Sequence, residues 1–233
     1  MYVKASERRE QLIAAARAVL ARGVAGTTLR AVAAEAGVPL GTLHYIFPSK
    51  ELMLAAVIDD VRQEVSAVFL AAESDAGLEH AIRSGLNRYW DQLIVNDPDM
   101  ALMRHELQLH ALRTPGLEHL ARAQMDGYVQ IVAKRCQEAA DTSGETCAVD
   151  FDTIARVLVG STTGMVLQYL TDHDRARSQR DLDTIAEMLI HLAGVEPGPT
   201  RPAVSITAEV VEAVKPSSSA TEHAIERREI PRH

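Results

Sequence analysis

The sequence has no apolar run of about 20 residues, the length that a helix needs to span a bilayer. Its start also lacks the apolar core of a secretory signal. Five of the first ten residues are charged, namely Lys4, Glu7, Arg8, Arg9 and Glu10. We therefore expect a cytoplasmic protein that has no membrane partner.

Cysteine and aromatic residues are also scarce. The only cysteines are Cys136 and Cys147, too few for a disulfide framework. We expect two reduced thiols, and a redox switch is the alternative. Aromatic residues make up 4% of the 233 positions, whereas hydrophobic residues as a whole make up 47%. This composition suits a helical core rich in alanine and leucine.

The usual catalytic and metal-binding patterns are missing as well. His105 and Glu106 would begin a zinc-protease motif only if a second histidine stood four residues after the first. That position is Leu109, and His110 stands one step too far along. The sequence has no nucleophile elbow and no phosphate-binding glycine loop. We predict that the protein is not an enzyme and has no metal site or cofactor.

The charge is unevenly distributed along the chain. The net charge is −8, but residues 1–54 hold seven Lys and Arg against four Glu, a net charge of +3. The remaining residues therefore carry −11. A basic segment joined to an acidic body is typical of a phosphate-binding module on a soluble core. An uneven scatter of charges by chance is the alternative explanation.

Residues 27–52 have the pattern of two short helices joined at a glycine. Thr28 is a good N-cap, and Gly37 can end the first helix because glycine adopts the left-handed conformation. Pro39 suits the first turn of the second helix, and Ser49 can cap a third. The apolar residues at helical spacing are Leu29, Val32, Ala33 and Ala36, then Leu43, Ile46 and Phe47. This is the helix-turn-helix pattern.

Over roughly residues 8–56 the chain is similar to the DNA-binding domain of the TetR family of bacterial transcriptional regulators. The matching residues are Thr28, Arg30, Ala33, Gly37, Val38, Gly41, Thr42, Leu43, Tyr45, Phe47, Ser49, Lys50 and Leu52. His44 stands where family members commonly carry tyrosine, and histidine can also donate to a phosphate.

The resemblance implies that the second helix of the motif enters the major groove of double-stranded DNA. It also implies that Arg30 reaches a guanine edge. We expect Lys50 to contact a phosphate or the adjoining helix end. The full set of DNA-binding residues that we predict is Thr28, Arg30, Pro39, Leu40, Gly41, Thr42, His44, Tyr45 and Lys50.

Helical periodicity continues through most of the chain and predicts an all-α fold. Besides the two short helices, we expect helices over 5–23, 49–72, 78–95, 98–112, 116–140, 150–171 and 180–193, with a loop at 141–144. We place a three-helix DNA-binding domain at 1–48 and a larger helical domain for effector binding and dimerisation at 49–193. The helix that begins at Ser49 is unbroken between them, so it can transmit motion.

Residues 194–233 differ in composition from the rest of the chain. Five of the nine prolines fall there, together with Ser217, Ser218 and Ser219. We predict a disordered tail. A short helix or strand over 204–214 is the alternative.

Several polar and aromatic residues fall on apolar helices. His105 lies on one helix face with Leu102, Leu109 and Leu112. Two interpretations are open: a core histidine that is hydrogen-bonded internally, or a polar group in a ligand pocket. The same choice applies to the other candidate effector-binding residues, which are Trp90, Gln168, Tyr89, Tyr128 and Tyr169.

The helix expected over 150–171 is apolar on two faces, so it needs two packing partners. Small residues from Gly160 to Gly164 allow close approach of another backbone. We predict that this helix and the last one form a four-helix bundle across a two-fold axis. The dimerisation residues are Leu158, Gly160, Gly164, Met165, Leu182, Ile185 and Leu189. The alternative is that both helices only close the core of one chain.

Together these patterns predict a homodimeric transcriptional repressor that binds a palindromic operator and is released by a small-molecule effector. An activator and a regulator without an effector are alternatives. A helical small-molecule-binding protein or enzyme with an incidental helix-turn-helix is a further one. The effector and the operator sequence are not readable from these residues.

Overall fold

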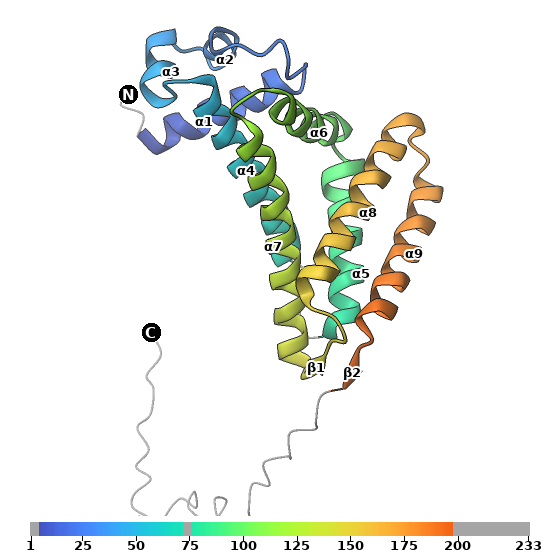
Figure 1. Ribbon diagram of the computed structural model, residues 1–233. Coiled ribbons are helices and arrows are strands. Elements are labelled where there is room, and N and C mark those ends of the chain that lie inside the picture. Colours follow the sequence, from blue (N-terminus) through green and yellow to red (C-terminus); the bar gives the residue numbers. More distant parts are fainter. Residues whose placement is uncertain (1–4, 72–75, 198–233) are drawn as a thin grey trace, which may run out of the picture. The chain divides into compact units, whose positions relative to one another are not determined.

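The computed structural model describes residues 5–71 and 76–197, and within them the fold is all-α (Figure 1). Within these ranges nine α-helices, one π-helix and one pair of two-residue strands account for the regular structure. The all-α prediction is confirmed. The possible element at 204–214 lies outside the described residues.

The first three helices form the head, defined here as α1 (Ala5–Leu20), α2 (Leu29–Glu35) and α3 (Leu40–Ile46). The first helix ends three residues before its expected end at Gly23. The Thr28 hydroxyl caps α2 by accepting from the Ala31 amide at 3.1 Å. Gly37 has a φ of +64°, the left-handed conformation that the turn requires. The Gln11 side chain donates to the Ala36 carbonyl at 2.9 Å and so ties this turn to α1.

Helix α4 (Lys50–Leu70) packs against the head with its first half and against the remaining helices with its second half. Ser49 caps it by accepting from the Leu52 amide at 3.2 Å. Its first half contributes Met53 and Leu54 to the same core as α1–α3, whereas Val65 and Phe69 belong to a second core. One unbroken helix therefore contributes side chains to both cores.

The remaining helices form the body. They are α5 (Gly77–Tyr89), the π-helix η1 (Trp90–Val95), α6 (Pro98–Arg113), α7 (Glu118–Ser143), α8 (Phe151–Asp172) and α9 (Arg175–Ala193). Helix α7 packs against α4, α5, α6 and α8, and Figure 1 shows it running alongside α4 on the side of the body away from α9. The core of the head also includes Met103 and Leu107 of α6.

Three local features differ from the sequence-based expectations. Residues 90–95 form a π-helix rather than the end of an α-helix. Helix α7 continues to Ser143, beyond the expected loop start, and ends at Gly144 with φ +69°. Helix α9 begins at Arg175, five residues early, because Asp174 caps it by accepting from the Arg177 amide at 2.9 Å.

The first residues of the expected tail are also ordered. Glu196–Pro197 forms β2, which pairs antiparallel with β1 (Glu145–Thr146). Backbone pairing to a distant segment is not visible in local composition, so the prediction of disorder was wrong for these two residues. The rest of the predicted tail, from residue 198 on, lies outside the described residues. Within 5–71 and 76–197, no helix is both long and apolar enough to cross a bilayer.

Candidate DNA-binding surface and ligand cavity

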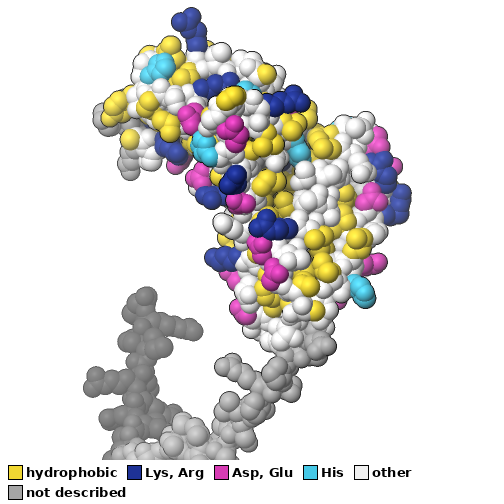
Figure 2. All heavy atoms as spheres, viewed as in Figure 1, with side chains coloured by type: hydrophobic (Ala, Val, Ile, Leu, Met, Phe, Trp, Pro, Cys, Tyr) yellow, Lys and Arg dark blue, Asp and Glu magenta, His cyan; other side chains and the backbone are white. Residues whose placement is uncertain are grey.

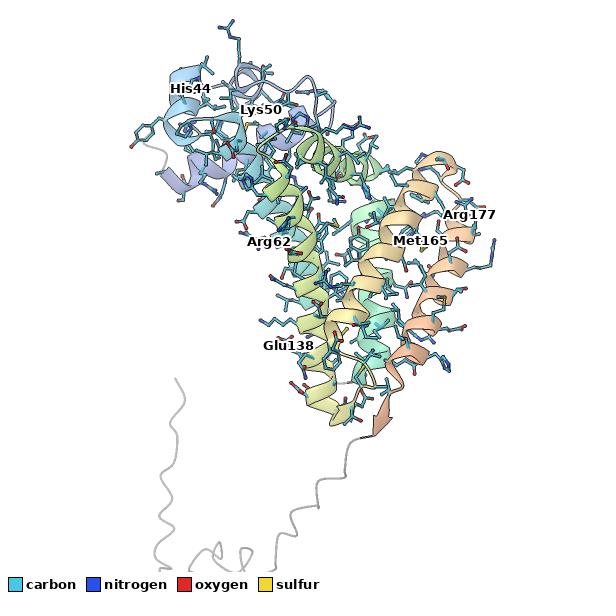
Figure 3. All side chains as sticks on the ribbon, in the orientation of Figure 1. His44, Lys50, Arg62, Glu138, Met165 and Arg177 are labelled. Carbon is cyan, nitrogen blue, oxygen red and sulfur yellow. The ribbon has the colours of Figure 1, made fainter. Side chains whose placement is uncertain are left out.

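The second helix of the helix-turn-helix, α3, presents most of the predicted DNA-binding residues to solvent. Pro39, Gly41 and His44 are exposed, and Tyr45 is 89% exposed, whereas Leu43 is buried and holds the helix to the head. Leu40 and Thr42 are half-buried at the edges of this face. Figure 3 labels His44 at this end of the molecule. An exposed tyrosine on a short helix is available for a partner.

Two further predicted residues flank α3. Thr28 and Arg30 are exposed at the start of α2, and no ion pair holds Arg30 among the residues that the structure describes. Figure 2 shows Lys and Arg side chains projecting at the helix-turn-helix end of the molecule. The Arg30 side chain is therefore accessible to a binding partner.

Lys50 differs from these residues because it is half-buried at the start of α4. Burial lowers its pKa. The pKa of His110, near the end of α6, is lowered mainly by burial and further by the positive charge of Lys50. Lys50 therefore lies close to the end of α6. Of the two roles expected for Lys50, this position favours contact with the adjoining helix end.

The body contains a cavity of about 40 Å³ bounded by α4, α5, α6, α7 and α8. Its lining is mixed, with aromatic, aliphatic and uncharged polar side chains and one guanidinium, that of Arg104. Space of this size holds roughly two or three water molecules. The aromatic and polar lining residues are Phe69, Tyr89, Arg104, His105, Gln108, Gln124, Tyr128, Thr162 and Thr163.

Three of the six predicted effector-binding residues line this cavity. Burial raises the pKa of Tyr89 to about 12 and also raises the pKa of Tyr128, so both phenols are neutral. His105 Nδ1 lies 2.9 Å from the Ala101 carbonyl, which only accepts, so this nitrogen carries the proton. Burial lowers the pKa of His105. His105 therefore fits both interpretations, because it is internally hydrogen-bonded and also lines the cavity.

The other three predicted residues lie elsewhere. Trp90 and Tyr169 are buried against each other, edge to face, with ring centroids 5.5 Å apart. They do not line the cavity. Gln168 is exposed on the far side of α8 from the core. Helical spacing identified apolar surroundings for these residues, but it could not show which neighbours cover them.

The helix face assigned to α6 was also wrong. Leu102, Leu109 and Leu112 are exposed by 44%, 53% and 54%. The buried face of α6 contains Met103, Arg104, Leu107 and two alanines. Sequence reasoning missed Arg104 because a buried arginine is uncommon and its partners are distant in sequence.

Arg104 joins the cavity to the head through charged side chains. Its Nη1 donates to the Leu93 carbonyl in η1 at 2.9 Å, and its Nη2 lies 3.7 Å from Glu64 Oε2 in α4. The same carboxylate accepts from Arg17 in α1 at 2.8 Å. Arg17 also donates to Asp60 at 2.7 Å. A continuous polar path therefore runs from the cavity wall to α1.

Helices α8 and α9 pack against each other, and each leaves an apolar face exposed. The exposed large residues are Val157 and Leu167 on α8 and Met188 and Leu192 on α9. Gly160 and Gly164 lie on the α8 face, and a Cβ at either position would meet no atom within 4 Å. A helical face with small residues between large apolar ones suits a second helix.

Most of the predicted dimerisation residues lie on the opposite faces of these helices. Leu158, Met165, Leu182 and Leu189 are buried in the core of one chain, and Ile185 is half-buried (Figure 3 labels Met165). The assignment of the four leucine and methionine residues to a dimer interface is therefore wrong, because one chain already covers them, whereas Ile185 is only partly covered. Of the predicted set, Gly160 and Gly164 are exposed and Ile185 is half-exposed, so these three remain compatible with an interface.

No group of three or more His, Cys, Asp and Glu side chains suited to a metal ion occurs in the part of the chain that the structure describes. Cys136 and Cys147 are both free thiols. Burial raises the pKa of Cys136 to about 12, so this thiol stays protonated.

An exposed helix-turn-helix joined to a larger helical body is the architecture of a class of DNA-binding transcriptional regulators. Two family models match the chain. The model for "Bacterial regulatory proteins, tetR family" matches residues 12–57, and "Tetracyclin repressor-like, C-terminal domain" matches residues 80–195. The chain belongs to the TetR family of transcriptional regulators.

Among individual proteins, the chain is 27% identical over 197 residues to the HTH-type nicotine-responsive transcriptional repressor HdnoR of Paenarthrobacter nicotinovorans. This match covers 84% of the chain and 100% of HdnoR. The multidrug binding protein EbrR, solved with ethidium, is 29% identical, with a TM-score of 0.59 over 80% of this chain and 99% of that one. A transcriptional regulator from Rhodococcus sp. Rha1 shares the fold at 20% identity. Its TM-score is 0.66, and the match covers 82% of this chain and 99% of the Rhodococcus chain.

Proposed function

We propose that this protein is a cytoplasmic, homodimeric repressor that binds a palindromic operator and is released by a small molecule that enters the body cavity. The observation that carries the proposal is the polar path from the cavity wall through Arg104 and Glu64 to Arg17 of the head. A regulator without an effector would need no such link between the cavity and the head.

Operator binding depends on α3 and the start of α2. The exposed backbone and side chains of α3 can enter the major groove, and Arg30 can read guanine with two hydrogen bonds. Two heads related by a two-fold axis require an inverted repeat. Their half-sites should lie about one helical turn, roughly 34 Å, or a multiple of it apart.

Dimerisation uses the uncovered faces of α8 and α9. Two copies that bring Val157, Leu167 and Met188 together would form a four-helix bundle, with Gly160 and Gly164 allowing close backbone approach. Apolar side chains exposed by 39% to 61% gain from burial at such an interface. The interface therefore lies on the side of these helices that faces away from the core of each chain.

Effector binding must change the shape of the body, because a cavity of about 40 Å³ is too small for most organic molecules. Entry of a ligand separates α6 from α7 or α8, and Arg104 moves with α6. Since Arg104 and Arg17 share Glu64, the displacement alters how α1 sits on α4. The effector releases DNA only if it favours a head arrangement that fits the operator badly.

The relatives support a small-molecule effector without identifying it. HdnoR is named as nicotine-responsive and EbrR is solved with ethidium. These are properties of those proteins.

The decisive experiment maps genomic binding sites and then measures affinity for the recovered operator with and without candidate effectors. We expect a palindromic footprint bound by a dimer, and release at saturating effector. By linkage, DNA must weaken effector binding by the same factor, typically 5- to 150-fold. A footprint on a single half-site, or an operator affinity that saturating ligand leaves unchanged, would contradict the proposal.

A further inference from the structure

We infer that the effector is an uncharged planar molecule that offers a hydrogen-bond acceptor to Arg104 Nε and a donor to Gln124 Oε1. This inference rests on the function proposed above, because it assumes that the cavity is the effector site. It specifies the chemistry of the ligand, which that proposal leaves open. Two buried polar atoms and the charge balance of the wall carry it.

The first atom is the Arg104 Nε. The Arg104 side chain is 5% exposed and lines the cavity. Its two terminal nitrogens face Leu93 and Glu64, but its Nε–H is buried with no hydrogen-bond partner among the described residues. A buried donor without a partner is costly, so a ligand that supplies an acceptor there is favoured.

The second atom is the Gln124 Oε1. Gln124 is 3% exposed, and its Nε2 donates to the Arg104 carbonyl at 3.3 Å. A carbonyl oxygen only accepts, so the Gln124 side-chain amide must place Nε2 toward the Arg104 carbonyl. Its Oε1 therefore points away from that carbonyl. Within the described part of the chain, Oε1 is buried without a donor. Two residues of the cavity wall thus each carry a buried polar atom without a partner, a donor on Arg104 and an acceptor on Gln124, which a ligand that separates the helices can pair.

The charge of the wall selects against ions. Among the described residues no Asp or Glu lines the cavity, so a cation would meet the Arg104 guanidinium with no counterion beside it. Glu64 already lies 3.7 Å from that guanidinium and offsets part of its charge. An anion would therefore compete with Glu64, whereas an uncharged ligand leaves the pair intact.

The shape of the cavity favours a flat ligand. The rings of Phe69, Tyr89 and Tyr128 contribute to the walls, and the free volume is about 40 Å³. A planar ring needs less separation of the helices than a bulky aliphatic group does. Aromatic walls also gain from contact with another ring. Amides, lactams and comparable planar molecules meet all of these requirements.

The test uses four compounds that share one ring and differ in one group: benzamide, benzoate, benzamidine and toluene. Binding to the full chain without DNA is measured by calorimetry up to roughly 10 mM, a range that suits such small ligands. We expect benzamide to bind about tenfold more tightly than each of the other three. Tightest binding of benzoate or benzamidine, equal binding of toluene, or no binding of benzamide overturns the inference.

Two changes isolate the hydrogen bond to Gln124. N,N-dimethylbenzamide keeps the carbonyl but lacks the donor, so we expect it to bind about tenfold more weakly than benzamide without any change to the protein. Gln124→Met should produce a similar loss for benzamide itself, after thermal unfolding shows that the variant is folded. The matched control is Gln130→Met, an exposed position on the same helix, which should bind as wild type does. Undiminished binding of dimethylbenzamide overturns the role of Gln124.

The outcome separates this inference from the proposed function. If benzamide binds selectively but leaves operator affinity unchanged, the effector-release proposal fails and the ligand chemistry stands. If a charged compound releases the operator instead, the ligand chemistry fails and the regulatory function stands.

Discussion

The head and the body use opposite strategies to place functional side chains. In the head, the candidate DNA-binding residues all lie within residues 28–50 and are mostly exposed, while a few buried residues such as Leu43 hold the scaffold. In the body, the cavity collects side chains from five helices, and the most informative ones, Arg104 and Gln124, are buried. A surface that reads DNA can be local in sequence, whereas an internal ligand site cannot.

The largest expected effect comes from comparing two neighbours on α9. Leu189 is 1% exposed and Met188 is 61% exposed. Leu189→Glu buries a charge in the core and should cost at least about 4 kcal/mol, enough to unfold much of the protein. Met188→Glu should keep the folded monomer but weaken the dimer. Thermal unfolding followed by circular dichroism measures the stability of each variant, and sedimentation measures its oligomeric state. A stable Leu189→Glu monomer would show that the assignment of Leu189 to the core is wrong.

The next effect concerns the head alone. Arg30→Ala should cost about 1–3 kcal/mol at one base pair of the operator and relax specificity there. Affinity for the operator and for random DNA is measured by fluorescence anisotropy at one salt concentration. The control is Arg122→Ala, an exposed arginine on α7. An equal loss on both DNAs would remove Arg30 from the base-reading residues.

A smaller effect tests the link between the two regions. Glu64→Gln leaves Arg104 without its ion-pair partner, while Arg17 keeps Asp60. Because Glu64 is 34% exposed, solvent screens the pair, and we expect a loss of only about 1 kcal/mol of stability in urea unfolding. Effector-dependent release should weaken more than operator binding does. Asp152→Asn, which removes an exposed pair with Arg156, is the control and should change neither quantity.

The smallest effect is a pH dependence from the cavity wall. Burial lowers the pKa of His105, and the Arg104 charge adds to this, so the folded protein favours the neutral ring. The unfolded chain then binds more protons, and stability is lost as the pH falls through the ordinary histidine pKa of about 6.5 toward the lower folded value. His105→Gln should flatten this loss, measured as unfolding free energy against pH. An unchanged slope in His105→Gln would show that another group causes the loss.

The helix-turn-helix was predictable because its determinants are local. Thr28, Gly37 and Ser49 act on amides and dihedrals within a few residues, and the structure places all three as caps or turn residues. The body was predictable only in part. Tyr89, His105 and Tyr128 were identified from apolar surroundings, but Trp90, Gln168 and Tyr169 have similar surroundings in sequence and lie outside the cavity.

By itself, the sequence determined the all-α class, most helix positions and the DNA-binding motif, because capping, periodicity and glycine conformations act over short distances. Only the tertiary structure decided which face of α8 and α9 is covered, and it placed Leu158 and Leu189 in the core rather than at an interface. It also decided that Arg104 is buried. Two groups from other helices, the Glu64 carboxylate and the Leu93 carbonyl, offset the cost of burying this charge. Helical periodicity shows that a residue shares a face with others, but the neighbour that covers that face is set by the packing of the whole chain.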